Sequence, residues 1–143
     1  ILSQARDSGK KVVFTNGYFD LLHAGHVETI QKSKSFGDIL VLAINSDASV
    51  KKLKGPSRPL QNEDDRARIL AALAAVDYIT VFGEETPLEL INLLKPHVLV
   101  KGGDYKADSI VGAKEVKSWG GRVEIIQLVE GRSTTSLVTK AKL

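Results

Sequence analysis

Short apolar runs recur along the chain, separated by longer stretches that mix apolar and polar residues. This pattern is typical of strands that alternate with helices. Five runs are short enough to be strands, and they span residues 12–14, 39–44, 78–82, 98–100 and 123–126. The first run leads through a turn to residues 27–30, where a helical pattern opens.

Helix signals fill the stretches between the later runs. Asn62 is a predicted N-cap with acidic residues in the first turn, followed by apolar residues at helical spacing (69, 70, 73 and 76). The segment 86–89 is a predicted capping box with Pro87 at the first helical position, opening a helix to about residue 94. Two more helices are expected, one over residues 110–119 and a last one capped by Ser133 or Thr134.

The alternation of strands and helices predicts one fold class. It implies a parallel sheet with right-handed crossovers, in a doubly wound, Rossmann-like α/β fold of three layers with five strands. A length of 143 residues fits one domain over residues 1–143. The sequence shows no internal repeat and no low-complexity segment.

Two histidines stand where the first turn meets the first helix. His23 and His26 are three residues apart, so they share one helix face, and Gly25 lies between them without a side chain. A helix N-terminus presents unpaired N–H groups and a partial positive charge. The segment is therefore suited to phosphate oxygens. An alternative is that both histidines are helix caps or core residues.

Other polar segments follow the predicted strands at their carboxyl ends. In doubly wound folds, ligands bind at that edge, where the strand order reverses. The segment 131–135 adds hydroxyls, backbone donors and a guanidinium at a second helix N-terminus, which also suits phosphate. The segments expected at the edge are 15–26, 45–47, 101–105 and 131–135.

Charge and composition exclude several classes of protein. The net charge of +3 is modest, and the dense basic cluster of Lys51, Lys52, Lys54 and Arg58 has no interleaved aromatics. It fits a small polyanion better than nucleic acid, although a solvated loop is the alternative. The chain has no cysteine, which rules out disulfides and thiolate metal sites. No signal peptide or membrane-spanning run is visible, so we expect a cytoplasmic protein. The chain begins at Ile1 without any Met, so we expect it to lack its native start, which leaves room for a preceding domain.

Other nucleotide and metal motifs are missing. No G-x-x-x-x-G-K-[ST] sequence is present, and no G-x-G-x-x-G follows the first strand. P-loop and dinucleotide redox chemistry are therefore disfavoured. Zinc at His23 and His26 would need further ligands, and His97 is the only other histidine.

The motif His23-Ala24-Gly25-His26, in its strand–turn–helix setting, resembles the His-x-Gly-His signature of the nucleotidyltransferase superfamily. The chain is most similar to the D-glycero-β-D-manno-heptose 1-phosphate adenylyltransferase family, stand-alone or as the C-terminal half of bifunctional ADP-heptose synthases. The matching segments are 19–26, 54–60, 65–73, 76–78, 98–105 and 131–137. One departure is Tyr18, where many bifunctional members are expected to carry Cys.

A rival resemblance is to glycerol-3-phosphate cytidylyltransferases, which share the first motif and a similar length. That family carries an arginine two residues before its Val-Asp pair, and here Ala74 precedes Val76-Asp77 in that place. The difference favours ATP over CTP. A nucleotide-binding module without turnover is a third hypothesis, disfavoured by the histidine pair together with Lys54.

The resemblance implies direct adenylyl transfer from ATP to the sugar 1-phosphate, with release of pyrophosphate. An ionised acceptor phosphate needs no general base, so the protein's task is positioning and charge stabilisation. His23, His26 and Lys54 would be catalytic, with Lys54 and either Lys51 or Lys52 closing over the phosphates. Nucleotide contacts are expected from Thr15, Asn16, Gly17, Tyr18, Phe19, Gly25, Gly102, Asp104, Arg132, Ser133, Thr134 and Thr135. Asp47 would bind acceptor hydroxyls, and Lys101 or Arg58 the acceptor phosphate.

The basic cluster lies in a long predicted loop over residues 51–60, punctuated by Gly55, Pro56 and Pro59. We expect this loop to be a mobile lid that orders with ATP. Mg²⁺ is expected to arrive on the ATP phosphates, because no carboxylate cage is visible. The expected partners are ATP and a sugar 1-phosphate, with no nucleic acid and no membrane, and the expected assembly is a homo-oligomer (a dimer or higher).

Overall fold

Strands and helices alternate along most of the chain, as the sequence pattern predicts. The computed structural model describes residues 7–103, 106 and 109–127. In chain order, its elements are β1 (Val12–Gly17), α2 (Ala24–Lys34), β2 (Ile39–Asn45), α3 (Asp47–Lys54), α4 (Glu63–Ala71), β3 (Tyr78–Phe82), α5 (Leu88–Leu94), β4 (Val98–Gly102), α6 (Ala113–Ser118) and β5 (Arg122–Ile126). Among the described residues, no helix is both long enough and apolar enough to cross a membrane.

The strands form one five-stranded sheet in the order β3-β2-β1-β4-β5, and every pair is parallel. The chain winds outward from β1 to β3, then returns to the other side of β1 to place β4 and β5. The strand order therefore reverses between β1 and β4, which is where doubly wound folds bind their ligands. The predicted fold class is confirmed.

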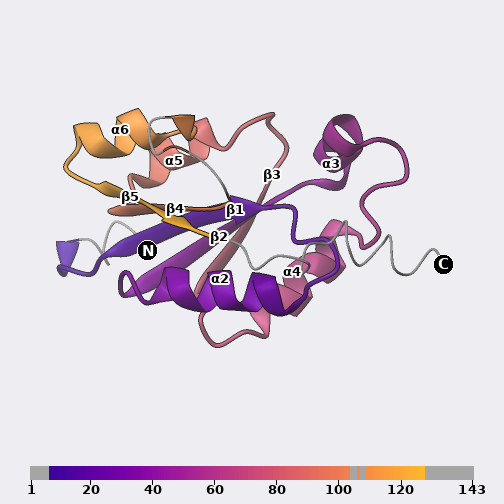
Figure 1. Cartoon of the computed structure of the whole chain (residues 1–143), viewed down its shortest axis with the longest axis horizontal. Coiled ribbons are helices and arrows are strands. Elements are labelled where there is room, and N and C mark those ends of the chain that lie inside the picture. Colours follow the sequence, from indigo (N-terminus) through magenta and orange to yellow (C-terminus); the bar gives the residue numbers. More distant parts are fainter. Residues whose placement is uncertain (1–6, 104–105, 107–108, 128–143) are drawn as a thin grey trace.

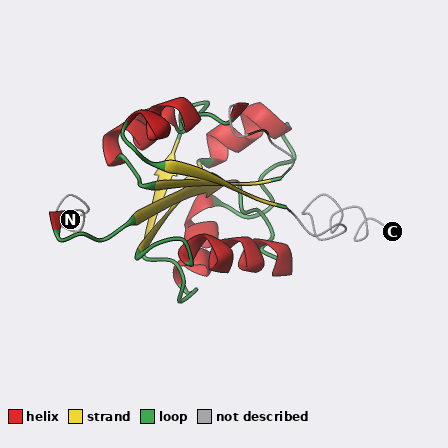
Figure 2. Cartoon of the chain, turned by 60° about the vertical axis from the view of Figure 1, so that its left-hand side comes forward, coloured by secondary structure: helices red, strands yellow, loops and turns green. Residues whose placement is uncertain are grey.

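Helices cover both faces of the sheet, as Figures 1 and 2 show. Helices α2 and α4 lie on one face, and α5 and α6 on the other. Side chains alternate along β1, so Val12 and Phe14 join one core cluster with Ile91 and Val116, while Val13 joins the opposite cluster. Both cores hold the carboxyl ends of β1 and β4 in fixed positions.

Three local predictions differ from the structure. The predicted loop over residues 51–60 begins as the last turn of α3, which Ser46 caps through a hydrogen bond from the Ser49 amide. Gly55 ends this helix at a φ of 102°, a backbone conformation that favours glycine.

The predicted capping box at Thr86 is wrong. Pro87 itself is the N-cap of α5, and no side chain caps that helix. The helix predicted over residues 110–119 is shorter, because Gly112 at a φ of 89° precedes α6. The last predicted helix, at Ser133 or Thr134, lies outside the described residues.

Candidate functional site

A cavity of about 300 Å³ opens where the strand order reverses. Its floor is the end of β1, and one wall is the end of β4. The turn after β1, helix α2 and the loop after α3 complete it. The lining residues are Thr15, Asn16, Gly17, Tyr18, Phe19, Asp20, His26, Thr29, Val50, Lys54, Arg58, Lys101 and Gly102.

The turn after β1 has an unusual backbone. Phe19 and Leu21 adopt positive φ angles of 49° and 58°, which non-glycine residues rarely do. The Phe19 ring lies against Gly17, where an added Cβ would come within 3.0 Å of the ring. Any larger residue at position 17 would therefore push the ring aside. The bend aims the chain from β1 into α2.

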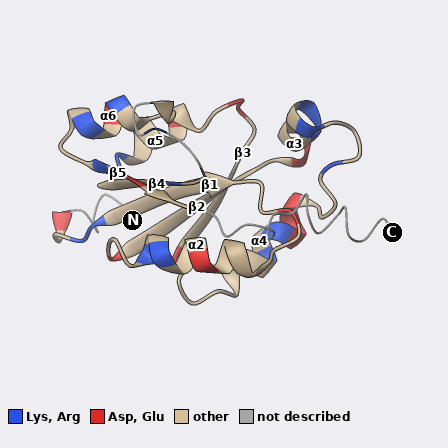
Figure 3. Ribbon diagram, in the orientation of Figure 1, with Lys and Arg blue, Asp and Glu red and all other residues tan. Residues whose placement is uncertain are grey.

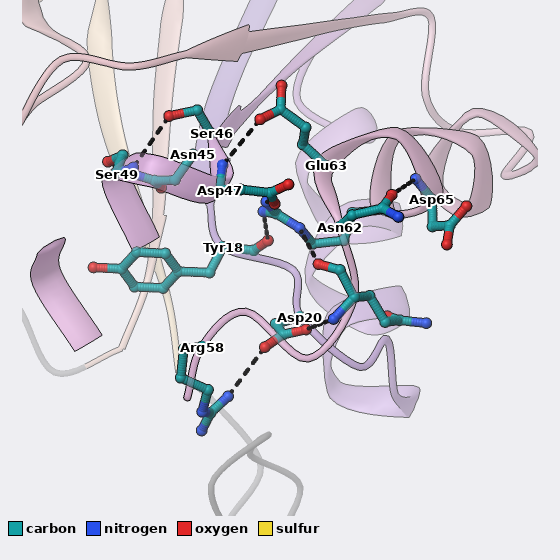
Figure 4. Close-up of polar contacts among 12 residues, drawn as sticks. Tyr18, Asp20, Asn45, Ser46, Asp47, Ser49, Arg58, Asn62, Glu63 and Asp65 are labelled. Atoms are coloured by element: carbon teal, nitrogen blue, oxygen red, sulfur yellow. Dashed lines mark hydrogen bonds and ion pairs between the residues drawn. The ribbon is translucent and has the colours of Figure 1, made fainter. Parts of the chain in front are cut away.

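Asp20 holds this turn against the loop after α3. Its side chain is buried, and it accepts hydrogen bonds from the amides of Leu60 (2.8 Å) and Gln61 (2.9 Å). The Arg58 guanidinium also pairs with it at 3.2 Å, as Figure 4 shows. The Leu21 amide in turn donates to the Gln61 side chain. The loop is therefore fastened to the histidine-bearing turn at several points.

The two histidines form a reciprocal cap at the start of α2. His23 is the N-cap, and its Nδ1 accepts from the Gly25 amide at 3.1 Å. His26 Nδ1 accepts from the His23 amide at 3.2 Å. A neutral imidazole has one N–H, so a ring whose Nδ1 accepts carries its proton on Nε2. Both histidines are therefore helix caps, as the alternative interpretation of the motif predicts. The capping bonds use only Nδ1, so each ring still has an Nε2–H donor.

The rings of His23 and His26 stack, with centroids 3.8 Å apart and an interplanar angle of 29°. The Phe19 ring lies 5.4 Å from that of His26. Burial and, to a lesser extent, the charge on His23 lower the pKa of His26 to about 4. His26 is therefore uncharged at neutral pH, and it offers a hydrogen bond rather than a full positive charge.

Two lysines bring positive charge to the cavity. Lys54, the last residue of α3, places its ammonium 5.1 Å from the centroid of the Tyr18 ring. Lys101 lies near the end of β4, where burial lowers its pKa. Figure 3 shows the basic residues of α3 at the carboxyl end of the sheet.

A second cavity of about 330 Å³ adjoins the first. The two share Asn16, Gly17, Tyr18, Lys54 and Lys101. The second cavity extends toward the ends of β2 and β3, and its further lining includes Asn45, Phe82, Glu85, Thr86 and Ser109. The site thus has two compartments that meet at Tyr18 and the two lysines.

The structure gathers most of the predicted site residues that it describes. Ten of them line the first cavity: Thr15, Asn16, Gly17, Tyr18, Phe19, His26, Lys54, Arg58, Lys101 and Gly102. His23 joins them because its ring stacks on that of His26, and the Gly25 amide donates a hydrogen bond to Nδ1 of the His23 ring. The Thr15 hydroxyl donates to the Val100 carbonyl inside the sheet. Asp104, Arg132, Ser133, Thr134 and Thr135 lie outside the described residues.

Besides His23 and Gly25, two predicted residues line neither cavity. Lys51 is exposed on α3. Asp47 is the first residue of α3, and its carboxylate pairs with Arg66 at 2.8 Å. The structure therefore joins Asp47 to a cation of the protein itself, whereas the sequence predicts a contact with acceptor hydroxyls.

Sequence reasoning missed Arg66, which lies in α4 and is completely buried. Its guanidinium donates to the Tyr18 carbonyl (2.8 Å), the Gln61 carbonyl (3.0 Å) and the Asp47 carboxylate (2.8 Å). It thereby joins the turn after β1, the loop before α4 and the start of α3. No local pattern marks Arg66, because its acceptors lie on three other segments. Asp20 was also missed as a support, although it lies inside the histidine motif.

The kinds of side chain at the site decide whether it can hold a metal ion or phosphate oxygens. Within residues 7–103, 106 and 109–127, no three His, Cys, Asp or Glu side chains gather into a group that could hold a metal ion. The site instead combines Nε2–H donors, ammonium groups and a helix N-terminus. These groups suit phosphate oxygens.

The chain belongs to the cytidylyltransferase-like family, whose model matches residues 14–140. It is therefore a nucleotidyltransferase-type enzyme. It is 59% identical to the bifunctional protein HldE of Syntrophotalea carbinolica and 58% identical to that of Geobacter sulfurreducens. Each match covers 98% of this chain but only 29% of the relative's length. A solved structure, the lipopolysaccharide core biosynthesis protein of Thermoplasma volcanium, matches with a TM-score of 0.67 at 27% identity, covering 85% of this chain and 98% of that one.

Proposed function

We propose that this chain transfers the adenylyl group of ATP to D-glycero-β-D-manno-heptose 1-phosphate, giving ADP-heptose and pyrophosphate. The observation that carries the proposal is the backbone-held pair of imidazoles beside a cavity with two lysines, at the reversal of strand order. The bifunctional HldE relatives and the name of the Thermoplasma protein support a sugar phosphate from lipopolysaccharide synthesis as the acceptor.

The reaction needs no covalent intermediate. An oxygen of the acceptor phosphate attacks the α-phosphorus of Mg²⁺–ATP in line. The bond from that phosphorus to the oxygen bridging the β-phosphate breaks, and pyrophosphate leaves with the electron pair. An acceptor phosphate is already ionised at neutral pH, so no base has to remove a proton. The protein supplies position and donors for the growing charge.

The two compartments divide the substrates. The triphosphate lies in the first cavity, where the Nε2–H groups of His23 and His26 meet the phosphates. The heptose lies in the second cavity. Lys54 and Lys101 border both compartments, so they can contact the α-phosphate and the acceptor phosphate together. Of the two candidates for the acceptor phosphate we favour Lys101, because Arg58 lines only the first cavity and pairs with Asp20.

The predicted lid spans residues 51–60, and since residues 51–54 belong to α3, the loop over residues 55–60 is the part that we still propose as a lid. Its anchor on Asp20 holds its second half. Only the turn at Gly55 and Pro56 would then move when nucleotide binds. Mg²⁺ enters as part of the nucleotide substrate.

A second candidate function is cytidylyl transfer to glycerol 3-phosphate, favoured by the description of the matching family as cytidylyltransferase-like. Ala74 argues against it, since the resemblance to that group would require an arginine there. A binding module without turnover is the remaining alternative.

A nucleotide-by-acceptor matrix read by pyrophosphate release tests the proposal. With the heptose 1-phosphate, we expect kcat/KM for ATP to exceed that for CTP by at least about 100-fold, because a site built for one base leaves polar groups unpaired with another. A preference for CTP with glycerol 3-phosphate would establish the second candidate. Absence of pyrophosphate from every pair would leave only the binding module.

A further inference from the structure

Tyr18 occupies the boundary between the two compartments. It lines both cavities, and its side chain is half-buried. The face of its ring lies under the Lys54 ammonium, at 5.1 Å from nitrogen to centroid. A cation at this distance from an aromatic face is attracted by the ring quadrupole. Tyr18 is therefore a contact of the lysine as well as a wall residue.

Lys54 needs such a contact because little else on its own element fixes it. It is exposed, and it ends an eight-residue helix just before Gly55. Ordering a lysine side chain costs up to about 1.5–2 kcal/mol of rotamer entropy. Lys51 and Lys52 on the same helix line neither cavity. Lys54 alone of the three is held over the junction.

Tyr18 is well placed to hold Lys54, because a buried side chain fixes the backbone of Tyr18. The Tyr18 carbonyl accepts from the buried guanidinium of Arg66 at 2.8 Å. The same guanidinium binds Asp47, the first residue of α3, also at 2.8 Å. In Figure 4, Tyr18 and Asp47 lie close together. The start of α3 and the backbone of Tyr18 are thus fixed together, and the ring meets Lys54 at the other end of the helix.

We propose that Tyr18 is a positioning residue that holds the Lys54 ammonium at the junction of the nucleotide and acceptor compartments. The inference rests on the proposed function, through the role of Lys54 in stabilising the transferring phosphate. The aromatic face supplies this role, and the hydroxyl does not. Phenylalanine should therefore replace tyrosine, whereas an aliphatic side chain of similar volume should not.

A double-mutant cycle between Tyr18 and Lys54 tests the proposal. We expect Y18F, which keeps the face of the ring, to lose much less kcat than Y18L. Y18L should lower kcat by about fivefold, which corresponds to about 1 kcal/mol of lost cation–π attraction, with a smaller change in KM. In a K54M background, Y18L should cost less than about twofold, because there is no ammonium left to position.

Equal losses from Y18L in both backgrounds would overturn the proposal, as would equal losses from Y18F and Y18L. Thermal unfolding of each variant identifies a folding defect, and Y18M replaces Y18L if that variant is unstable. If the wild type releases no pyrophosphate, the proposed function fails. The same cycle is then measured on the Kd of Mg²⁺–ATP. Coupling of about fivefold there supports the contact between Tyr18 and Lys54, and coupling near unity overturns it.

Discussion

Replacing His23 or His26 with alanine is expected to lower kcat by about 100- to 1,000-fold, or about 3–4 kcal/mol of transition-state stabilisation. Charge builds on the transferring and leaving phosphates mainly in the transition state, so KM for ATP should change far less. Both rings present Nε2–H because their Nδ1 atoms are fixed by backbone amides. Steady-state kinetics of pyrophosphate release measures the effect.

Alanine also removes a helix cap, so matched variants must separate the two roles. Asparagine is a good N-cap, and H23N should keep the start of α2 while losing the imidazole. Glutamine at the third helical position can reach back to the cap amide, so H26Q should do the same at His26. Both variants should unfold near the wild-type temperature and still be nearly inactive. Recovery of activity in H23N or H26Q would show that the histidines act only as caps.

Arg66→Met is expected to lower the free energy of unfolding by about 3–5 kcal/mol, because two part-buried carbonyls lose their donor at a cost of about 1–3 kcal/mol each. The substitution leaves the carbonyls of Tyr18 and Gln61 without their buried donor, and it deprives the carboxylate of Asp47 of its cation. R66K should recover little, because an ammonium cannot serve three acceptors in a planar fork. Urea denaturation of the purified variants measures the loss.

R68M is the matched control for this prediction. Arg68 lies in the same helix and is exposed. Its replacement should change stability by no more than about 0.5 kcal/mol. A loss in R66M within about 1 kcal/mol of the loss in R68M would contradict the role of Arg66 as the tie between the three segments.

The strands, the sheet and the histidine turn could be predicted because their signals are local. Apolar runs mark β1 to β5, and the doubly wound order follows from the alternation of strands and helices. The edge that gathers the site follows from the parallel arrangement. Lys101 and the segment 15–26 could therefore be placed together from the sequence alone.

Helix α3 was missed because its polar, lysine-rich end runs into Gly55 and Pro56, which are loop signals. A local signal did exist, since Ser46 is a good N-cap and Asp47 an acid in the first turn. Arg66 and Asp20 could not be assigned from sequence, because their partners are distant along the chain. Asp47 and Tyr18 lie 19 and 48 residues from Arg66. Arg58 and Gln61 lie 38 and 41 residues from Asp20. Tertiary contacts of this kind produce no periodic pattern in the amino-acid sequence.

The most direct test of the account is to follow the phosphorus atoms during the reaction. Wild-type protein, Mg²⁺–ATP and the heptose 1-phosphate are mixed and observed by ³¹P NMR. Attack at the α-phosphorus predicts that pyrophosphate and the diphosphate diester of ADP-heptose appear in equal amounts, without ADP. Appearance of ADP with a sugar bisphosphate would place the attack at the γ-phosphorus and contradict nucleotidyl transfer at the His23–His26 site.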